Sequence, residues 1–187
     1  LITGLITDVD LHPLPAVRIA ILNHPELGWT NTRSDGHFDL VVNAGGSLTV
    51  TMGLPGYLGA QRQVQTEWNH PTRLPDVVLT QLDPVATSID ISGTAGMQAA
   101  RGGTAIDHDG ARTGTLLFPS GVQATLTAMN GTSVSSSQLA IRVTEYTVGP
   151  NGAQQMPAEL PPNSAYTYAM DLSADGLRSA QFSKPLP

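Results

Sequence analysis

The chain has 187 residues, of which 13% are charged and 5% aromatic, and its formal net charge is −6. Because affinity for nucleic acid depends on clustered cations, this charge and the lack of a basic run argue against a nucleic-acid partner. The absence of cysteine excludes a disulfide framework and a thiolate metal site. No apolar run reaches the roughly 18 residues that cross a bilayer, so we expect no membrane insertion. The 19 Gly and 14 Pro predict frequent turns and an all-β fold.

Short apolar segments separated by Gly, Pro and Asn occupy residues 1–83, which predicts a transthyretin-like or Ig-like β-sandwich. The predicted strands are Ile2–Val9, Ala16–Leu22, Gly28–Thr32, His37–Val42, Ser47–Met52, Gln61–Trp68 and Asp76–Leu82. Alternating positions in these strands supply the best core candidates, Val17, Ile19, Ile21, Leu48, Val50 and Met52. Trp29 and Trp68 are further candidates for burial, provided that their indole N–H groups find partners.

Thr30–Leu40 predicts two strands joined by a tight turn. Asp35 and Gly36 suit a turn with positive φ, and Phe38 and Leu40 alternate after it as in a half-buried strand. We therefore expect a β-hairpin here.

Residues 84–112 are rich in Gly and Ala, and we expect a linker with one short strand at Ile89 and Ile91. Residues 113–187 predict a second β region that needs a partner surface to complete its core. Its predicted strands are Thr113–Phe118, Val122–Met129, Leu139–Val148, Tyr166–Leu172 and Ala180–Phe182. The polar run 130–137 suggests a flexible hairpin tip or linker, and the proline-rich run 156–162 suggests an extended connection.

Few residues suggest chemistry. The five histidines are scattered over turns and strand ends and form no helical zinc pair. Asp8 and Asp10 could meet Asp35 and Asp39 as calcium ligands, although turn carboxylates are the simpler interpretation. The run 107–110 copies only the opening of a calcium loop and is better read as an Asp-Gly turn.

No Ser/His/Asp set, nucleophile elbow or phosphate loop stands out in the sequence. Asn130 begins a three-residue glycosylation pattern that is short enough to arise by chance. The runs 54–58 and 166–170 carry aromatic and aliphatic groups that suit either a core or a partner surface. We expect no catalytic, cofactor-binding or metal-binding residue, and no cofactor.

Several spaced motifs carry a family resemblance. Gly4-x-Ile6-x-Asp8, Pro13-x-Pro15-x-Val17-x-Ile19 and Thr32-x-x-Asp35-Gly36-x-Phe38-x-Leu40 resemble the carboxypeptidase regulatory-like, transthyretin-like sandwich. The longer run His24–Val50 resembles the corresponding module of teneurins and of bacterial Rhs (YD-repeat) proteins. Runs 115–119 and 142–152 resemble the segment that follows it in Rhs-type proteins, a region called the fibronectin-like plug in teneurins.

This resemblance implies a non-catalytic structural module that docks on a YD-repeat shell, in cis or as a separate chain, and helps to close it. In bacterial relatives the shell encloses a toxin, so the expected location is extracellular or on a bacterial cell surface. The alternative is a stand-alone adhesin or carbohydrate-binding module, which predicts an exposed aromatic row including Trp29 or Trp68 and calcium near Asp8 and Asp10. An enzyme is the third reading and requires a pocket with convergent His and carboxylate groups.

Overall fold

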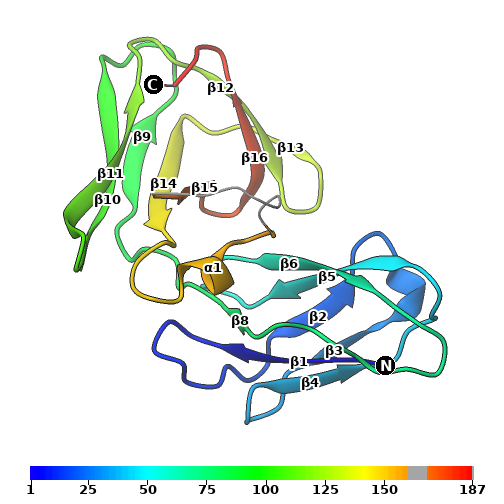
Figure 1. Cartoon of the computed structure of the whole chain (residues 1–187). Coiled ribbons are helices and arrows are strands. Elements are labelled where there is room, and N and C mark those ends of the chain that lie inside the picture. The colour runs from blue at the N-terminus through cyan, green and yellow to red at the C-terminus, as the bar shows by residue number, and fades with distance from the viewer. Residues whose placement is uncertain (160–167, 187) are drawn as a thin grey trace. The chain divides into compact units, whose positions relative to one another are not determined.

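The computed structural model describes residues 1–159 and 168–186. These residues form two compact units (Figure 1). The first comprises Leu1–Leu82 and a return segment, residues 149–159; the second comprises Asp83–Val148 and residues 168–186. The described part of the chain contains no helix that is long and apolar enough to span a membrane.

The first unit is a sandwich of two sheets. One sheet has the order β4-β1-β7, with β8 also paired to β1, and the other has the order β3-β2-β5-β6. The strands are β1 (Ile2–Thr7), β2 (Arg18–Ile21), β3 (Trp29–Asn31), β4 (His37–Leu40), β5 (Ser47–Gly53), β6 (Ala60–Gln65), β7 (Thr72–Arg73) and β8 (Val77–Val78). A 3-10 helix, Pro25–Leu27, and the short helix α1, Gly152–Gln155, complete the unit.

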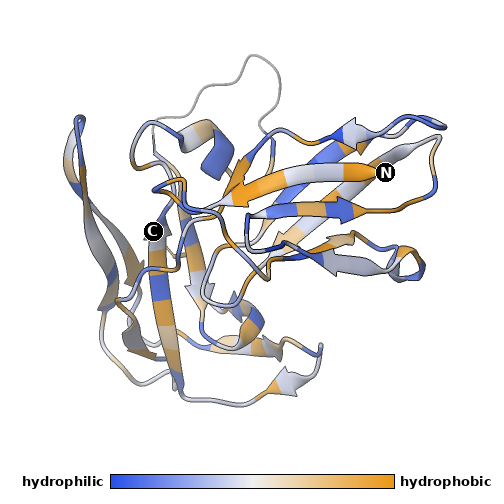
Figure 2. Ribbon diagram, turned by 90° about the horizontal axis from the view of Figure 1, so that it is seen from below, coloured by the Kyte–Doolittle hydropathy of each residue, from blue (hydrophilic) through white to orange (hydrophobic). Residues whose placement is uncertain are grey.

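The core of the sandwich lies between its two sheets and is built from alternating apolar positions. Figure 2 shows hydrophobic residues at the start of β1, beside the N-terminal label, and again toward its end, with paler residues between them. Five core candidates are buried as predicted, namely Val17, Ile19, Ile21, Val50 and Met52, and Leu48 is partly buried.

The two tryptophans, which the sequence offered as candidates for burial, are instead exposed, as the adhesin alternative expects of Trp29 or Trp68. Trp29 is 54% exposed and Trp68 is 70% exposed. The Arg18 guanidinium lies over the Trp29 ring, 4.6 Å from the ring centre, and this cation–π contact is compatible with a surface position. These indoles therefore stay at the surface of the sandwich.

The predicted hairpin at Thr30–Leu40 has the right turn but the wrong pairing. The Gly36 N–H donates to the Arg33 carbonyl over 2.9 Å, and Gly36 has a φ of 76°. However, β3 pairs with β2 whereas β4 pairs with β1, so the chain crosses from one sheet to the other. The buried Thr32 stabilises the crossing because its Oγ1 donates to the Leu14 carbonyl over 2.6 Å and accepts from the Val17 N–H over 2.9 Å.

The return segment is held to the sandwich by a buried arginine. Arg62, on β6, is only 5% exposed, and its guanidinium donates to the carbonyls of Met156 and Gln154 over 2.9 Å each. The Gln61 N–H also donates to the Pro157 carbonyl over 2.7 Å, so this segment covers part of the edge of β6. The predicted extended run 156–162 is described only as far as residue 159, and its remainder lies outside the described residues.

The second unit surrounds its own core with three sheets. Their orders are β15-β14-β9, β13-β12-β16 and β10-β11. The strands are β9 (Thr87–Asp90), β10 (Gln98–Asp107), β11 (Gly110–Phe118), β12 (Ala124–Ala128), β13 (Ser133–Val134), β14 (Gln138–Glu145), β15 (Met170–Ala174) and β16 (Leu177–Phe182). The largest buried side chains in this core are Phe118, Ile89 and Leu126.

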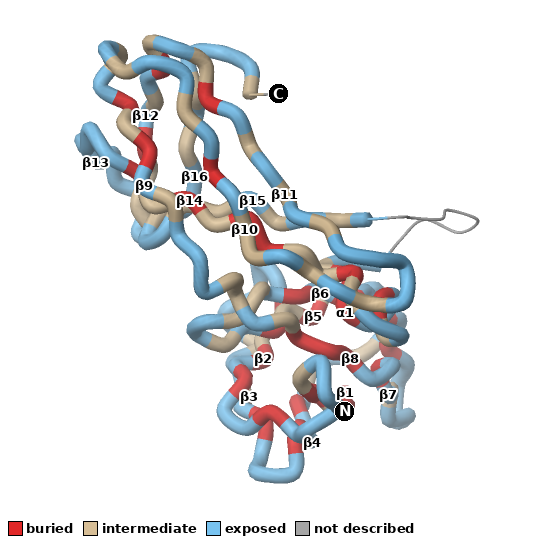
Figure 3. Tube along the Cα trace, turned by 90° about the vertical axis from the view of Figure 1, so that its left-hand side faces the viewer, coloured by how far each residue is buried: buried red, intermediate tan, exposed pale blue. Residues whose placement is uncertain are grey.

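The expected linker at residues 84–112 is instead part of the second unit. It contains β9, β10 and the start of β11, and β10 and β11 form a long antiparallel hairpin. The glycines that suggested flexibility serve close packing here: a Cβ at Gly102 would lie 2.1 Å from the Val143 carbonyl oxygen. Figure 3 shows that most of this hairpin is exposed or of intermediate burial.

The strand at Leu139–Val148 is observed as β14, and its predicted apolar face is buried through Leu139, Ile141 and Val143. The polar run 130–137 contains β13, which pairs with β12. The strand expected at Tyr166–Leu172 begins at Met170 in the described residues, and Tyr166 and Thr167 lie outside them.

Candidate interaction surfaces

The structure brings Asp8 and Asp10 together with His12 rather than with Asp35 and Asp39. The Asp8 carboxylate accepts hydrogen bonds from the N–H groups of Asp10 and His12 over 2.9 and 2.8 Å, so it stabilises its own loop. Asp39 pairs with Arg33. The four-carboxylate cluster that the sequence allowed as an alternative is therefore not assembled.

The second acidic cluster, at residues 107–109, sits at the tip of the β10–β11 hairpin. Arg112 donates to both carboxylate oxygens of Asp107 over 2.8 Å and to Glu145 over 2.6 Å. These hydrogen bonds raise the pKa of Arg112 above its ordinary value. The Arg112 guanidinium also lies 4.5 Å from the centre of the Tyr168 ring. The Asp-Gly turn is thus an ion-paired hairpin turn, as the simpler interpretation expected.

The two runs that the sequence suggests as core or partner surface, 54–58 and 166–170, differ in how exposed they are. Leu54 and Tyr57 are partly buried against the core of the first unit, so the run 54–58 is chiefly part of that core. Tyr168 and Met170 remain 50% and 43% exposed in the second unit.

The edge strand β15 presents an apolar face that is incompletely covered. Val143 lies opposite Leu172 in the β14–β15 ladder, and directly opposite residues point to the same side of a sheet. Val143 is 3% exposed and belongs to the core, whereas Leu172 is 54% exposed. The face of the sheet that is buried at β14 is therefore exposed to solvent at β15.

An apolar groove adjoins this open edge. It has a volume of about 330 Å³, and Leu116, Ile141, Leu172, Leu177 and Phe182 contribute to its wall. Three of these side chains, Leu116, Leu177 and Phe182, are only partly buried against the core. Large apolar side chains left partly exposed in this way suit a protein–protein contact.

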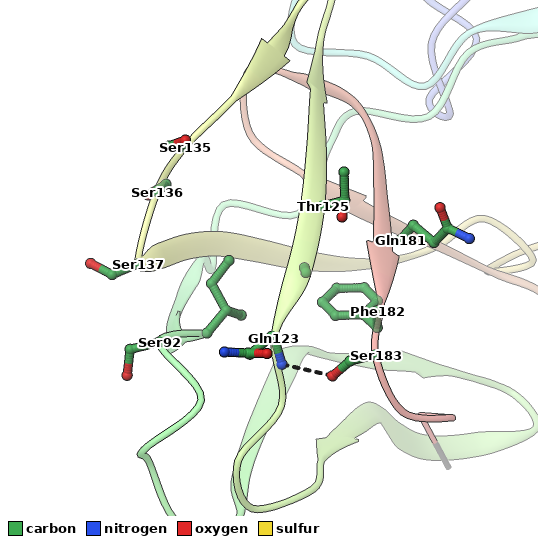
Figure 4. Close-up of a pocket in the computed structure, with 11 residues that line it drawn as sticks. Ser92, Gln123, Thr125, Ser135, Ser136, Ser137, Gln181, Phe182 and Ser183 are labelled. Carbon is green, nitrogen blue, oxygen red and sulfur yellow. Dashed lines mark hydrogen bonds between the residues drawn. The ribbon is translucent and has the colours of Figure 1, made fainter.

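A second hollow in the same unit is polar. It has a volume of about 790 Å³ and lies between the ends of β12 and β16 and the segment that follows β13 (Figure 4). Ser92 and the runs 123–125, 135–137 and 181–183 line most of it. Sequence reasoning missed it because its parts are far apart in the chain, and the serine-rich run 135–137 was its only local signal.

Comparison with known proteins matches residues 1–79 to the family described as "Teneurin TTR-like domain". Chicken (Gallus gallus) Teneurin-1 is 32% identical over 91 residues, which are 49% of this chain and 3% of that protein. Mouse (Mus musculus) Teneurin-3 is 35% identical over 92 residues, again 49% of this chain and 3% of that protein. Drosophila melanogaster Teneurin-m is 34% identical over 67 residues, 36% of this chain and 2% of that protein.

These findings support the teneurin resemblance of the first region and its transthyretin-like fold. The matched stretch spans only 2–3% of the length of these relatives, which are far larger proteins. All three are animal proteins, so they give no support to the expected bacterial source.

Proposed function

We propose that this chain is a non-catalytic structural module of a larger secreted or cell-surface YD-repeat protein of teneurin or Rhs type. In this function the first unit is a stable transthyretin-like scaffold. The second unit docks on the YD-repeat shell, in cis or as a separate chain, and helps to close it; in the bacterial Rhs type, this shell holds a toxin.

The uncovered apolar edge of β15 is the observation that carries the docking role. Leu172 and Met170 are on the core side of their sheet, yet they are 54% and 43% exposed. Burying such side chains stabilises by roughly 25 cal/mol per Å² of apolar surface removed from water. A partner that covers β15 and the adjoining groove would complete the core of the second unit, which is what a module closing a larger shell requires.

The positions of the acidic clusters agree with a structural role. In both clusters carboxylates bind groups within their own turn or hairpin, namely backbone N–H groups at Asp8 and the Arg112 guanidinium at Asp107. Both arrangements stabilise loops. The ionisable residues that line the apolar groove are Asp171 and Arg178, which belong to neither cluster.

The family part of the proposal is tested by sequencing the gene on either side of the region that encodes this chain, where a YD-repeat series is expected. A gene without such a series would refute the assignment to a larger YD-repeat protein and docking in cis.

The docking part is tested by producing that YD-repeat region separately and measuring its binding to this chain. Leu172→Glu places a charge on the open edge and is expected to weaken binding by about tenfold or more, as removal of a central interface residue does. Ile106→Glu is the matched control, because Ile106 is 71% exposed on β10 and does not line the apolar groove. Equal binding by Leu172→Glu and the control would rule out β15 as the docking edge.

A further inference from the structure

The hydrogen bonds of the β14–β15 ladder fix which backbone groups of β15 face β14. In an antiparallel ladder every second residue exchanges hydrogen bonds with the residue opposite, and the residues between direct their N–H and C=O groups to the other side. The Asp175 N–H donates to the Ala140 carbonyl over 2.9 Å, and the Tyr146 N–H donates to the Ala169 carbonyl over 3.2 Å. Both pairs continue the register of this ladder, so the odd-numbered residues of β15 are bonded to β14.

The even-numbered residues of β15, namely Met170, Leu172 and Ala174, therefore direct their N–H and C=O groups to the open side of the sheet. No described strand pairs with β15 on that side, and these groups form no hydrogen bond elsewhere in the described part of the chain. An edge with several free positions in succession is a template for another strand. The backbone of β15 can thus accept an added strand.

The apolar groove lies along this edge. Its lining includes four consecutive residues at 171–174 in β15 and four at 177–180 in β16. Since successive side chains of a strand point to opposite faces, a hollow that reaches every residue of such a run also reaches the edge of the backbone. Leu116, Ile141 and Phe182 contribute apolar side chains to the same groove. A chain extended along β15 would therefore place every second side chain among apolar groups.

Ser173 provides a second sign that a partner is missing at this edge. Its Oγ is buried and has no hydrogen-bond partner among the described residues. Ser173 lines the groove and lies opposite Arg142, on the face of the sheet that is turned away from Leu172. Buried polar groups are nearly always paired. A residue of an added strand directly opposite Ser173 would be on the same face and close enough to hydrogen bond with it.

The charge of the chain favours a different protein over a second copy as the source of the strand. The formal net charge is −6, which disfavours self-association. Asp171 is on the same face of β15 as Ser173 and also lines the groove, so a basic residue opposite it would be attracted. The edge suits a strand in which apolar residues alternate with polar or basic ones.

We propose that β15 binds its partner by strand addition. An extended segment of the YD-repeat shell pairs with the free edge, bonds to the backbone of Met170, Leu172 and Ala174, and directs apolar side chains into the groove at a spacing of two residues. This inference rests on the docking function proposed above and specifies how the partner is recognised.

The first test uses a synthetic heptapeptide, Lys-Val-Thr-Val-Lys-Val-Thr, and amide exchange of the ¹⁵N-labelled chain followed by NMR. Without peptide, the amides of Met170, Leu172 and Ala174 should exchange faster than those of Asp171 and Ser173, which are bonded to β14. When about nine-tenths of the chain is bound, exchange of the three free amides should slow about tenfold, because it then occurs from the unbound fraction.

Two matched controls accompany the peptide. Val-Val-Val-Lys-Thr-Lys-Thr has the same composition and charge without the alternation and is expected to give no protection. In the chain, Leu172→Glu should abolish protection, whereas Ile106→Glu, at an exposed position of β10 outside the groove, should leave it unchanged. Equal protection by the two peptides, or none from the alternating peptide at millimolar concentration, would overturn strand addition. Protection that rises with the concentration of the chain alone would overturn it as well, because a second copy would then occupy the edge.

The same exchange measurement with the separately produced YD-repeat region distinguishes this inference from the docking function. Binding that Leu172→Glu weakens, without protection of the three free amides, would support docking at β15 and refute strand addition. Protection by the alternating peptide without any binding of the YD-repeat region would support strand addition and refute the shell as the source of the strand.

Discussion

Gly36 lies directly against the backbone of Ile6. The Ile6 N–H donates to the Gly36 carbonyl over 3.0 Å, and a Cβ at position 36 would lie 2.5 Å from the Ile6 carbonyl oxygen. Two features therefore favour glycine at position 36: its φ of 76° lies in the left-handed region, and β1 approaches too closely to leave room for a Cβ. This contact ties the turn before β4 to the strand with which β4 pairs.

Replacing Gly36 by Ala is expected to destabilise the first unit strongly. Gly56 provides the matched control, because its φ is also positive, at 84°, but no described residue lies within 4 Å of a Cβ there. Gly56→Ala should cost about 1–2 kcal/mol, the usual penalty of the left-handed conformation. Gly36→Ala should cost roughly a further 1–3 kcal/mol from overpacking. Amide hydrogen exchange in β1 and β5 measures both, and equal costs would show that the contact with Ile6 is unimportant.

The glycine-rich segment offers a second matched pair. Gly102→Ala places a Cβ 2.1 Å from the Val143 carbonyl oxygen, whereas the Cβ of Gly96→Ala has no atom of the described part of the chain within 4 Å. If the segment packs as described, Gly102→Ala should speed amide exchange in β10 and β14, and Gly96→Ala should be close to neutral. A flexible linker would instead tolerate both changes equally, so a neutral Gly102→Ala would contradict the packed hairpin.

Arg62 is expected to control the order of the return segment. Burial lowers the pKa of Arg62, and the carbonyls of Met156 and Gln154 depend on its guanidinium as a hydrogen-bond donor. Arg62→Gln should increase amide exchange and proteolytic cleavage in residues 152–158, because each buried acceptor left without a partner costs about 1–3 kcal/mol.

Arg73→Gln is the control for Arg62, since the Arg73 side chain is 69% exposed and, among the described residues, forms its ion pair with Asp76 at the surface. It should leave cleavage of residues 152–158 unchanged. Similar cleavage of both variants would mean that the arginine does not anchor the segment.

The stability of the second unit should depend on pH through Asp175. Hydrogen bonds from Arg142, of 2.7 and 2.8 Å, lower the pKa of Asp175 below its ordinary value. The stabilising contribution is thus fully present above the unfolded-state pKa of about 3.9 and is lost as the pH falls through the folded-state pKa. Because the side chain is 41% exposed, solvent screening keeps this contribution small.

Asp175→Asn is therefore expected to be less stable than the wild type near pH 7, and this difference in stability is expected to shrink as the pH falls below about 3.9. Urea unfolding followed by circular dichroism across this range is the measurement. A stability difference that grows on acidification would have the wrong sign for this pair.

Much of the fold could be predicted because it depends on local order in the sequence. The alternation of Val17, Ile19 and Ile21 matches the two-residue period of a strand with one buried face, and these side chains are buried. The Asp35-Gly36 turn was likewise predictable, because a short polar residue and a glycine favour it wherever the strands go.

The candidate surfaces could not be predicted in the same way. Leu172 reads as an ordinary strand residue, and its exposure depends on β15 being at the edge of its sheet. The polar hollow joins Ser92, Gln123 and Ser183, residues separated by long stretches of chain.

The sequence by itself determined that this protein is all-β, where most of its strands lie, and that its first region resembles a teneurin module. These properties depend on side-chain periodicity and on turn residues, which act over a few positions. Only the tertiary structure decided that β3 and β4 join different sheets, that Gly102 serves close packing, and that Arg62 is buried. Each of these depends on which distant backbone approaches the residue, and that approach is set by the packing of the whole core rather than by local preference.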